Sequence, residues 1–251
     1  MITNRQCREV QELVKKAKAR RETGLFVVEG ERIVREIPSA LLQTVYVSET
    51  YVATEKAPEG AEVVTDAQFS KIADTKTPQG ILAVAKIPTF STEILRKKKG
   101  LFLLLEAIQD PGNLGTIFRV AEGAGVDAII LDAKTADPYA PKTVRSTMGS
   151  IFRQPHFLTE DAKDTVLAWK RDGVKVFAAH LAGAIRYDTA DYSGGTAFLI
   201  GNEGNGLSEE LTALSDQRII IPMGGRLESL NAGVAASLLV YEAARQRGFE
   251  G

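Results

Sequence analysis

Residues 101–119 read LFLLLEAIQDPGNLGTIFR and pass from an apolar run through a polar turn into a helical pattern. No uninterrupted apolar run in the chain is longer than Leu101 to Leu105, which suits a buried strand and falls far short of the roughly 18 residues of a membrane span. The turn at Asp110 to Gly112 precedes Asn113, which we expect to open a helix that carries Arg119. The stretch predicts one strand–loop–helix unit of a parallel α/β fold.

The same alternation of apolar runs and helical stretches continues to the end of the chain. Further strands are expected at Ala128 to Leu131, Lys175 to Ala179, Ala197 to Gly201 and Arg218 to Pro222, with helices around Gly115 to Gly123, Ala162 to Arg171, Ser208 to Leu214 and Asn231 to Arg247. Such strands predict a parallel sheet covered on both faces, with ligands bound at the carboxyl ends of the strands. The last helix is apolar around more of its circumference than one buried face needs, so we expect a second subunit to cover it.

A polar stretch at residues 86–100 (KIPTFSTEILRKKKG) divides the chain. We expect a smaller α/β domain at residues 1–88, a linker at 89–100 and a larger α/β domain at 101–251. In the small domain, Asn4 is placed to cap the first helix. The remaining elements expected there are strands at Leu25 to Val28, Thr44 to Val47 and Ile81 to Ala85 and helices at Glu31 to Ile37 and Asp66 to Ala73.

Composition excludes several classes of protein. The single cysteine, Cys7, excludes an internal disulfide, and with only His156 and His180 beside it we expect no metal site. The polar amino terminus and the absence of a long apolar run predict a cytoplasmic protein without a membrane segment. A formal net charge of -1 argues against a protein that coats nucleic acid by charge alone.

The charge is nevertheless unevenly distributed. Residues 1–21 carry a local net charge of +5, so the remainder of the chain sums to -6. The stretch Tyr139 to Phe152 contains Lys142 and Arg145 and no acidic residue. We expect these basic side chains to contact RNA phosphates: Arg5, Arg8, Lys15, Lys16, Lys18, Arg20, Arg21, Lys142 and Arg145.

Two further loops follow predicted strands. GNEGNG at residues 201–206 lacks the Lys-Ser/Thr of a phosphate-binding P-loop and the G-x-G-x-x-G spacing of a dinucleotide site. It is still a glycine turn that lets a ligand approach the backbone closely. IPMGGRLESLN at residues 221–231 leads from a strand into the last helix, with Ser229 or Asn231 as its cap.

Together these three loops resemble a known family. N-x-G-x-x-x-R at Asn113 to Arg119, G-x-E-x-x-G at Gly201 to Gly206 and I-P-M-x-G…S-L-N at Ile221 to Asn231 are similar to the three ordered motifs of the SpoU (TrmH) family of RNA ribose methyltransferases. This family belongs to the SPOUT class, whose α/β fold contains a trefoil knot. The first domain resembles the family's RNA-binding substrate domain, itself similar to kink-turn-binding ribosomal proteins. The stretches that carry this resemblance are the basic helix at Asn4 to Arg21, Phe26 to Gly30 and Thr77 to Ala83.

The resemblance implies the reaction and its residues. It implies S-adenosylmethionine as the cofactor and a ribose 2'-hydroxyl in ribosomal RNA, rather than in transfer RNA, as the substrate. We also expect a homodimer through the knotted domain and the last helix, without DNA or membrane partners. The implied catalytic residues are Asn113, Arg119, Glu203, Ser229 and Asn231, and the implied cofactor-binding residues are Gly201, Ile221, Leu230, Leu131, Met223 and Gly206.

The role of Arg119 and the identity of the substrate leave alternatives open. A neutral arginine at pH 7 costs on the order of 7 to 8 kcal/mol, so we favour a charged Arg119 that stabilises the developing alkoxide over one that acts as a base. Ala232 and Gly233 stand where the family usually has Val-Ser, which affects helix packing or substrate preference. A transfer RNA methyltransferase, a base methyltransferase and a catalytically silent RNA-binding protein are the alternatives.

Overall fold

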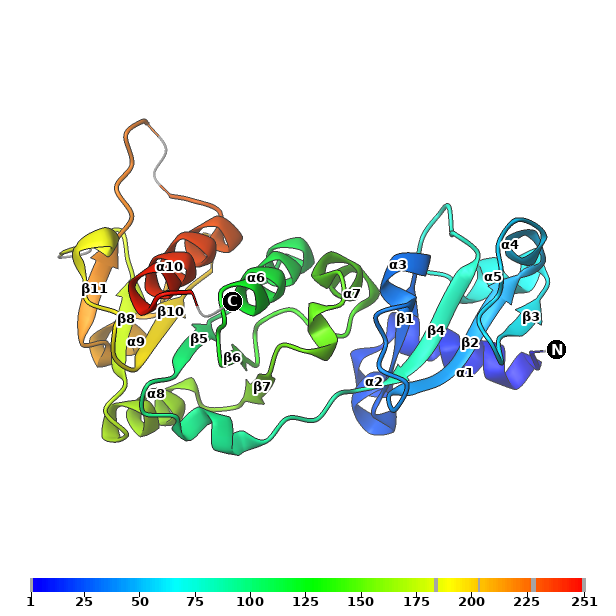
Figure 1. Ribbon diagram of the computed structural model, residues 1–251, viewed down its shortest axis with the longest axis horizontal. Coiled ribbons are helices and arrows are strands. Elements are labelled where there is room, and N and C mark those ends of the chain that lie inside the picture. Colours follow the sequence, from blue (N-terminus) through cyan, green and yellow to red (C-terminus); the bar gives the residue numbers. More distant parts are fainter. Residues whose placement is uncertain (1, 183–184, 203, 227–228, 250–251) are drawn as a thin grey trace. The chain divides into compact units, whose positions relative to one another are not determined.

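The computed structural model describes residues 2–182, 185–202, 204–226 and 229–249 (Figure 1). The chain forms two compact units, one of residues 1–89 and 137–152 and the other of residues 90–136 and 153–251. The first unit ends within the predicted linker at 89–100. Residues 137–152, which the sequence assigned to the larger domain, group instead with the amino-terminal unit.

The amino-terminal unit is a four-stranded sheet in the order β1-β4-β2-β3, with β2 and β3 parallel and the other pairs antiparallel. Helices α1 and α5 share an apolar cluster with this sheet, in which Phe69 and Ile72 are fully buried. Its elements are α1 (Asn4–Lys15), α2 (Ala17–Thr23), β1 (Leu25–Glu29), α3 (Glu31–Val34), β2 (Leu42–Ser48), α4 (Glu49–Thr54), β3 (Glu62–Val64), α5 (Asp66–Ile72), β4 (Ile81–Lys86), α7 (Pro141–Thr147) and the 3-10 turn η2 (Ser150–Phe152).

Two details of the first helical stretch differ from the prediction. Thr3, not Asn4, caps α1, because Thr3 and Gln6 form a reciprocal capping box. The expected basic helix is interrupted at Lys16, which is extended and separates α1 from α2.

The segment at residues 137–152 is fastened to the amino-terminal unit by buried groups. Phe26 of β1 packs its ring against Tyr139 and Phe152, with centroids 5.1 and 5.8 Å away. Arg20 forms an ion pair with Asp137 at 2.7 Å. These contacts join parts of the chain more than 100 residues apart, which explains why no local sequence pattern revealed them.

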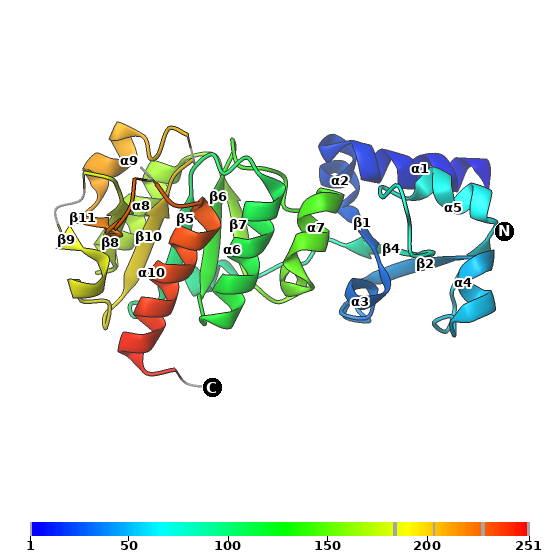
Figure 2. The same cartoon turned by 90° about the horizontal axis from the view of Figure 1, so that it is seen from above.

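The second unit is a seven-stranded sheet in the order β7-β6-β5-β10-β8-β11-β9, and every neighbouring pair is parallel. Helices α8 and α9 pack on one face around Trp169, whereas α6 and α10 lie side by side on the other (Figures 1 and 2). Its elements are η1 (Thr92–Arg96), β5 (Leu101–Leu105), α6 (Pro111–Gly123), β6 (Ala128–Asp132), β7 (His156–Thr159), α8 (Ala162–Arg171), β8 (Lys175–Ala179), β9 (Ile185–Arg186), η3 (Tyr187–Thr189), β10 (Thr196–Ile200), α9 (Glu209–Leu214), β11 (Gln217–Ile220) and α10 (Ala232–Arg247). The predicted parallel α/β sheet is confirmed. No helix in the described part of the chain is long and apolar enough to cross a membrane.

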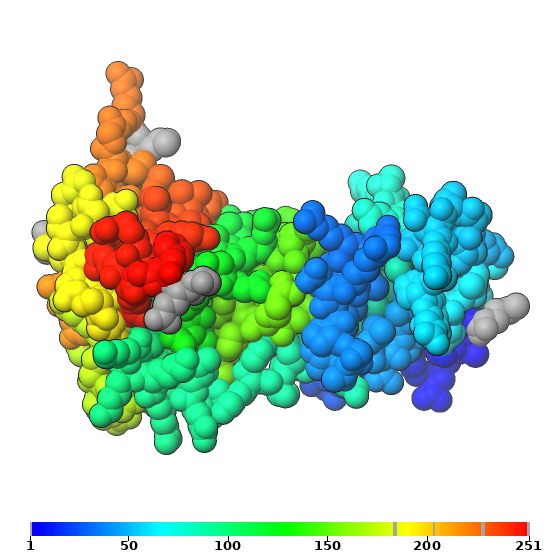
Figure 3. Space-filling view, viewed as in Figure 1, coloured from blue at the N-terminus to red at the C-terminus, as the bar shows by residue number. Residues whose placement is uncertain are grey.

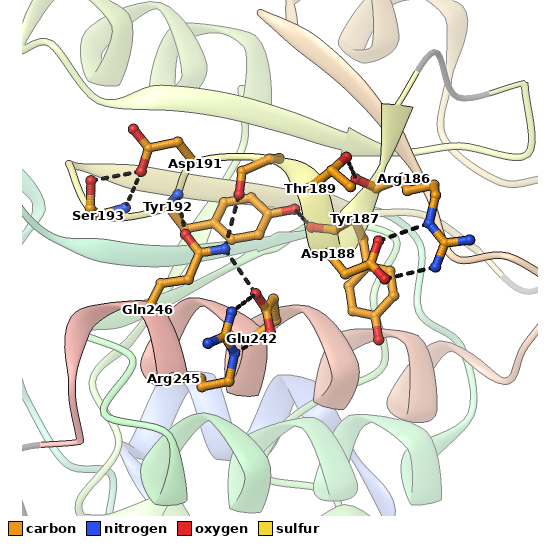
Figure 4. Close-up of polar contacts among 11 residues, drawn as sticks. Arg186, Tyr187, Asp188, Thr189, Asp191, Tyr192, Ser193, Glu242, Arg245 and Gln246 are labelled. Atoms are coloured by element: carbon orange, nitrogen blue, oxygen red, sulfur yellow. Dashed lines mark hydrogen bonds and ion pairs between the residues drawn. The ribbon is translucent and has the colours of Figure 1, made fainter.

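The carboxyl end of α10 is anchored by polar contacts to the segment that precedes β10 (Figure 4). Gln246 accepts a hydrogen bond from the Tyr192 amide at 2.8 Å and donates one to the Ala190 carbonyl at 2.9 Å. The Tyr192 hydroxyl donates to the Tyr187 carbonyl at 2.7 Å. This anchor fixes the far end of the helix that begins at the third motif.

His156 at the start of β7 gives the second unit a pH-dependent stability. Its ring is buried between Phe118 and Phe90, with centroids 4.9 and 5.3 Å away. Burial lowers the pKa of His156 to about 4, although a hydrogen bond with the Gln154 carbonyl opposes the shift. The folded protein therefore holds this imidazole neutral at pH values where the unfolded chain protonates it.

We expect the free energy of unfolding to fall as the pH drops below about 6.5, the ordinary pKa of histidine, down to about pH 4. The unfolded state binds the extra proton in this window, so His156 alone removes about 2 kcal/mol between pH 7.5 and 5.0. Urea unfolding at both pH values measures the loss. His156→Phe should show a smaller loss over the same interval, and an equal loss in both proteins would contradict this assignment.

Candidate active site

The three motif loops emerge at one edge of the parallel sheet. β5 pairs with β10, β10 with β8, and β8 with β11, all in parallel, so their carboxyl ends share an edge. The first motif follows β5, the glycine loop follows β10, and the third motif follows β11. This placement agrees with the expectation that a ligand site lies beyond the strand ends.

A cavity of about 340 Å³ lies at this edge. It is lined by five of the six predicted cofactor residues and by Ser229; the five are Gly201, Gly206, Ile221, Met223 and Leu230. Leu131 does not line it, because this side chain is fully buried within β6. Isoleucine, leucine and alanine side chains and the backbone of the glycine loop form most of the wall.

The glycine at position 201 is required by the fold of its own loop. A Cβ atom at Gly201 would lie 2.2 Å from the Gly206 carbonyl carbon and 2.3 Å from the Leu207 nitrogen. The loop closes on itself there, because Asn202 and Gly206 exchange backbone hydrogen bonds of 3.1 and 2.8 Å. A side chain at position 201 would thus collide with the returning loop, and the closer approach of a ligand that the sequence predicts here stays a prediction.

His180 is a cavity residue to which the sequence gave no role. Its Nδ1 accepts a hydrogen bond from the Ala182 amide at 3.0 Å, so the proton of the neutral ring is on Nε2. Within the described ranges, it is the single titratable side chain lining the cavity. Its position directly after β8 could have identified it as a site residue, because the other loops that line the cavity also follow strands of this sheet.

The first and third motifs meet through a pair of asparagines. Asp110, not Asn113, caps α6, with Oδ1 accepting from the Asn113 amide at 2.8 Å. The Asn113 side chain Oδ1 accepts from Asn231 Nδ2 at 2.7 Å, across 118 positions in sequence. Asn231 Oδ1 caps α10 by accepting from the Gly233 and Val234 amides. Two predicted catalytic residues are therefore in direct contact.

Arg119 lies on the side of α6 that faces α10. Thr116 is three residues before Arg119 and Gly123 is four residues after it, so the three residues form one stripe along the helix. A Cβ at Gly233 would lie 3.2 Å from Thr116, and one at Gly123 would lie 2.9 Å from the Tyr241 hydroxyl. Arg119 is exposed on this stripe and forms no ion pair with any residue the structure describes. The absence of a side chain at Gly233 lets the two helices approach closely.

The remaining predicted catalytic residues are Ser229 and Glu203. Ser229 is exposed at the cavity wall. Glu203 lies outside the described residues.

The structure corrects one of the predicted RNA contacts, Arg20, and places a second, Arg145, in ion pairs. Arg20 is 4% exposed and is bound to Asp137 and to the Leu13 carbonyl, so it is a structural residue. Arg145 is bound to Asp74 at 2.8 Å and lies 3.8 Å from the buried Glu29. The buried Arg20 guanidinium is therefore not available to phosphates, whereas the Arg145 side chain is 30% exposed and its contact with RNA stays a prediction.

The other predicted RNA contacts are exposed, but they differ in their ion pairs. Arg5, Lys16 and Lys18 each pair with a glutamate four residues away. Three more show no ion pair within the described residues: Arg8, Lys15 and Arg21. Lys142 is exposed on α7.

Comparison with known proteins identifies the fold and both units. The SpoU rRNA Methylase family matches residues 100–241, and the MRM3-like substrate binding domain matches residues 4–83. The 23S rRNA (guanosine(2553)-2'-O)-methyltransferase RlmP of Bacillus subtilis is 38% identical over 231 residues, which cover 89% of this chain and 90% of the relative.

Solved structures agree over nearly the whole chain. The SpoU methyltransferase AviRb of Streptomyces viridochromogenes, in complex with the cofactor AdoMet, has a TM-score of 0.84 at 27% identity and covers 98% of each chain. A putative RNA methyltransferase of the TrmH family from Porphyromonas gingivalis has a TM-score of 0.83 at 30% identity, covering 98% of this chain and 99% of the other. The resemblance seen in the three motifs is confirmed: this chain belongs to the SpoU rRNA methylase family and is an S-adenosylmethionine-dependent RNA ribose 2'-O-methyltransferase.

Proposed function

We propose that this enzyme methylates a ribose 2'-hydroxyl of large-subunit ribosomal RNA at the edge of the sheet where the three motif loops converge. The observation that carries the proposal is the asparagine pair Asn113–Asn231, which joins the first and third motifs beside the cavity. The matching relative of Bacillus subtilis is named for a 23S ribosomal RNA nucleotide, which supports ribosomal over transfer RNA. The substrate implies a cytoplasmic location.

The cavity fits S-adenosylmethionine in size and chemistry. Its volume of about 340 Å³ lies in the usual range for small-molecule sites. The apolar wall suits an adenine ring, and the glycine loop exposes backbone groups that can hydrogen-bond the adenosine and amino-acid ends. We assign cofactor binding to Gly201, Gly206, Ile221, Met223 and Leu230. The bound cofactor supplies an electrophilic methyl group on a sulfonium sulfur.

The side chains outside the cavity act on the RNA. Arg119 holds the substrate phosphate and stabilises the negative charge that develops on the ribose 2'-oxygen, which its fixed fork of donors suits. Asn113 and Asn231 orient the ribose through the amide groups of their pair. We also keep Ser229, which lines the cavity, and Glu203 as hydrogen-bonding residues of the site. Much of the rate then comes from the relative placement of two bound reactants.

The amino-terminal unit supplies RNA phosphate contacts through Arg8, Lys15 and Arg21. Arg8 and Lys15 are seven residues apart on α1 and so share a face of that helix. Their charges are not paired with carboxylates in the described structure, unlike those of Arg5, Lys16 and Lys18. We therefore expect the three side chains without ion pairs, and not the three paired ones, to neutralise RNA phosphates.

A triple variant tests this assignment by replacing Arg8, Lys15 and Arg21 with glutamine. We expect weaker RNA binding and the loss of two to three phosphate contacts, each of which contributes about 0.7 to 0.9 to the slope of log affinity against log salt concentration. The matched control replaces Arg5, Lys16 and Lys18 by glutamine, which removes the same formal charge. Filter binding at several salt concentrations measures both slopes. Equal reductions in the two triple variants would show that net charge, rather than these three side chains, guides the RNA.

The exposed side of α10 is the proposed dimer interface. Val234, Leu238 and Tyr241 are 46%, 36% and 44% exposed and follow the spacing of one helix face. Phe249 extends this apolar surface, with its ring 5.7 Å from that of Tyr241, and α10 lies at the molecular surface in Figure 3. We propose that a second copy of the chain covers this face. We also propose that the domain to which α10 belongs contains the trefoil knot of the SPOUT class. We propose no DNA partner.

Incubation with methyl-labelled S-adenosylmethionine and unmodified ribosomal RNA tests the proposed function. We expect label on a ribose of 23S RNA, located by nuclease digestion. Label on transfer RNA would select the alternative substrate. Label on a base, or cofactor binding without transfer to any RNA, would overturn the proposal in favour of a base methyltransferase or a silent RNA-binding protein.

A further inference from the structure

Ala107, two residues after β5, has a backbone conformation that non-glycine residues rarely adopt. Its φ is +56°, and Met148 at +51° is the only other non-glycine residue with positive φ in the described part of the chain. The Cβ atom makes this region costly for every residue except glycine, so surrounding contacts must enforce it. Ala107 lies in the loop that joins the interior strand β5 to α6, the helix that carries Asn113 and Arg119.

Side chains from both neighbouring strands hold Ala107 in place. Asp132 Oδ1, at the end of β6, accepts a hydrogen bond from the Ala107 amide at 2.9 Å. Asn202, just after β10, donates Nδ2 to the Ala107 carbonyl at 2.8 Å. The strained residue is therefore hydrogen-bonded on both of its backbone polar groups, once from each side of β5.

Each of these two side chains also makes further hydrogen bonds. Asn202 Oδ1 accepts from the Gly204 and Asn205 amides at 2.8 and 3.2 Å, and all three residues line the cavity. Asp132 Oδ1 also accepts from the amide and hydroxyl of Thr135 at 2.8 and 2.7 Å. Thr135 Oγ1 in turn accepts from the Ile108 amide at 3.2 Å.

Glu106 adds a second connection between the same two loops. Its carboxylate accepts from the Ser208 amide at 2.7 Å, at the start of α9 beyond the glycine loop. Its own amide donates to the Ile200 carbonyl at 2.9 Å. The glycine loop after β10 is therefore hydrogen-bonded to the β5–α6 loop at Ala107, and the residues that flank the glycine loop are hydrogen-bonded to Glu106.

We infer that Asp132 and Asn202 are positioning residues that hold Ala107 in the left-handed conformation and thereby set α6, with Asn113 and Arg119, in register with the cofactor cavity. The inference rests on the proposed function, because register matters only if the cavity delivers the methyl group and α6 faces the ribose. Neither Asp132 nor Ala107 lines the cavity. Loss of Asp132 should therefore slow methyl transfer more than it weakens cofactor binding.

The test compares Asp132→Ala, Ala107→Gly and the double variant in single-turnover methyl transfer and in calorimetric titration with S-adenosylmethionine. We expect Asp132→Ala to lower the rate about 10- to 100-fold and to change the cofactor Kd less than about threefold. Ala107→Gly should keep the wild-type rate, because glycine adopts positive φ without the Cβ penalty. In the double variant, the same glycine should restore the rate about tenfold over Asp132→Ala.

Met148→Gly is the matched control, since it removes the other positive-φ side chain at a position in the amino-terminal unit. Added to Asp132→Ala, it should restore nothing. A double variant no faster than Asp132→Ala, in an active and folded enzyme, would reduce Asp132 to a general structural residue and overturn the inference. A wild-type enzyme that binds cofactor but transfers no methyl group would instead overturn the proposed function, so the two failures are distinguishable.

Discussion

Arg119→Ala is expected to slow single-turnover methyl transfer about 100- to 1,000-fold, the usual cost of removing one preorganised group that stabilises developing charge. The cofactor Kd should stay within about twofold of the wild type, because Arg119 lies on the α10 side of α6 and does not line the cavity. Rapid-quench assays with saturating cofactor measure the rate, and calorimetry measures the affinity. This split between rate and affinity distinguishes a residue that acts on the ribose from one that shapes the cofactor site.

The conservative variant tests whether the guanidinium itself is needed. Arg119→Lys keeps the positive charge and loses the planar fork of donors, so we expect a rate between those of alanine and wild type with an unshifted pH profile. Arg171→Ala removes an exposed arginine from α8, on the opposite face of the sheet, and should leave the rate unchanged. Full activity in Arg119→Lys would refute a specific guanidinium role.

The strands that sequence predicted well are those buried on both faces. The predicted bounds of β5 and β8 coincide with the observed ones, because a short apolar run between polar turns is typical of a buried strand in a parallel sheet. β7 (HFLT) at the edge of the sheet was missed, and so was β3 (EVV). Each is short and carries polar residues, so its sequence resembles that of a loop.

The candidate site was predictable as a set of loops but not as a set of contacts. Strand ends in a parallel sheet share an edge, so three unusual loops after three strands point to one place. The contact between Asn113 and Asn231 joins positions 118 residues apart, and no local pattern contains it. The sequence also failed to predict that Asp110 caps α6. Because Asp110 is the cap, the Asn113 side chain is left to bind Asn231.

Basic residues were the weakest part of the sequence prediction. Arg20 and Arg145 look like surface charges in the sequence, yet each meets a carboxylate within the amino-terminal unit. Arg145 belongs to the 137–152 segment, and its partners Glu29 and Asp74 come from the amino-terminal 89 residues. A charge count cannot distinguish a free arginine from a paired one, because the pairing depends on tertiary neighbours.

Gly201→Ala is expected to weaken S-adenosylmethionine binding about 10- to 100-fold, the effect of roughly 1 to 3 kcal/mol of overpacking strain. The added methyl group would lie 2.2 to 2.4 Å from backbone atoms of Gly206 and Leu207, which cannot rotate away as a side chain could. The loop must therefore open, and the hydrogen bonds between Asn202 and Gly206 that close the cavity wall are strained or broken. Isothermal titration with the cofactor measures the loss, and circular dichroism checks that the sheet is intact.

Gly224→Ala provides the matched control within the third motif. A Cβ at Gly224 meets nothing within 4 Å, so the same chemical change there should leave the cofactor Kd unchanged. Methyl transfer by Gly201→Ala should recover in part at high cofactor concentration, because Asn113, Asn231 and Arg119 lie outside the glycine loop. If Gly201→Ala instead binds cofactor as tightly as the wild type, the closed form of this loop is not the form that holds S-adenosylmethionine, and the cofactor site must be sought elsewhere along the strand ends.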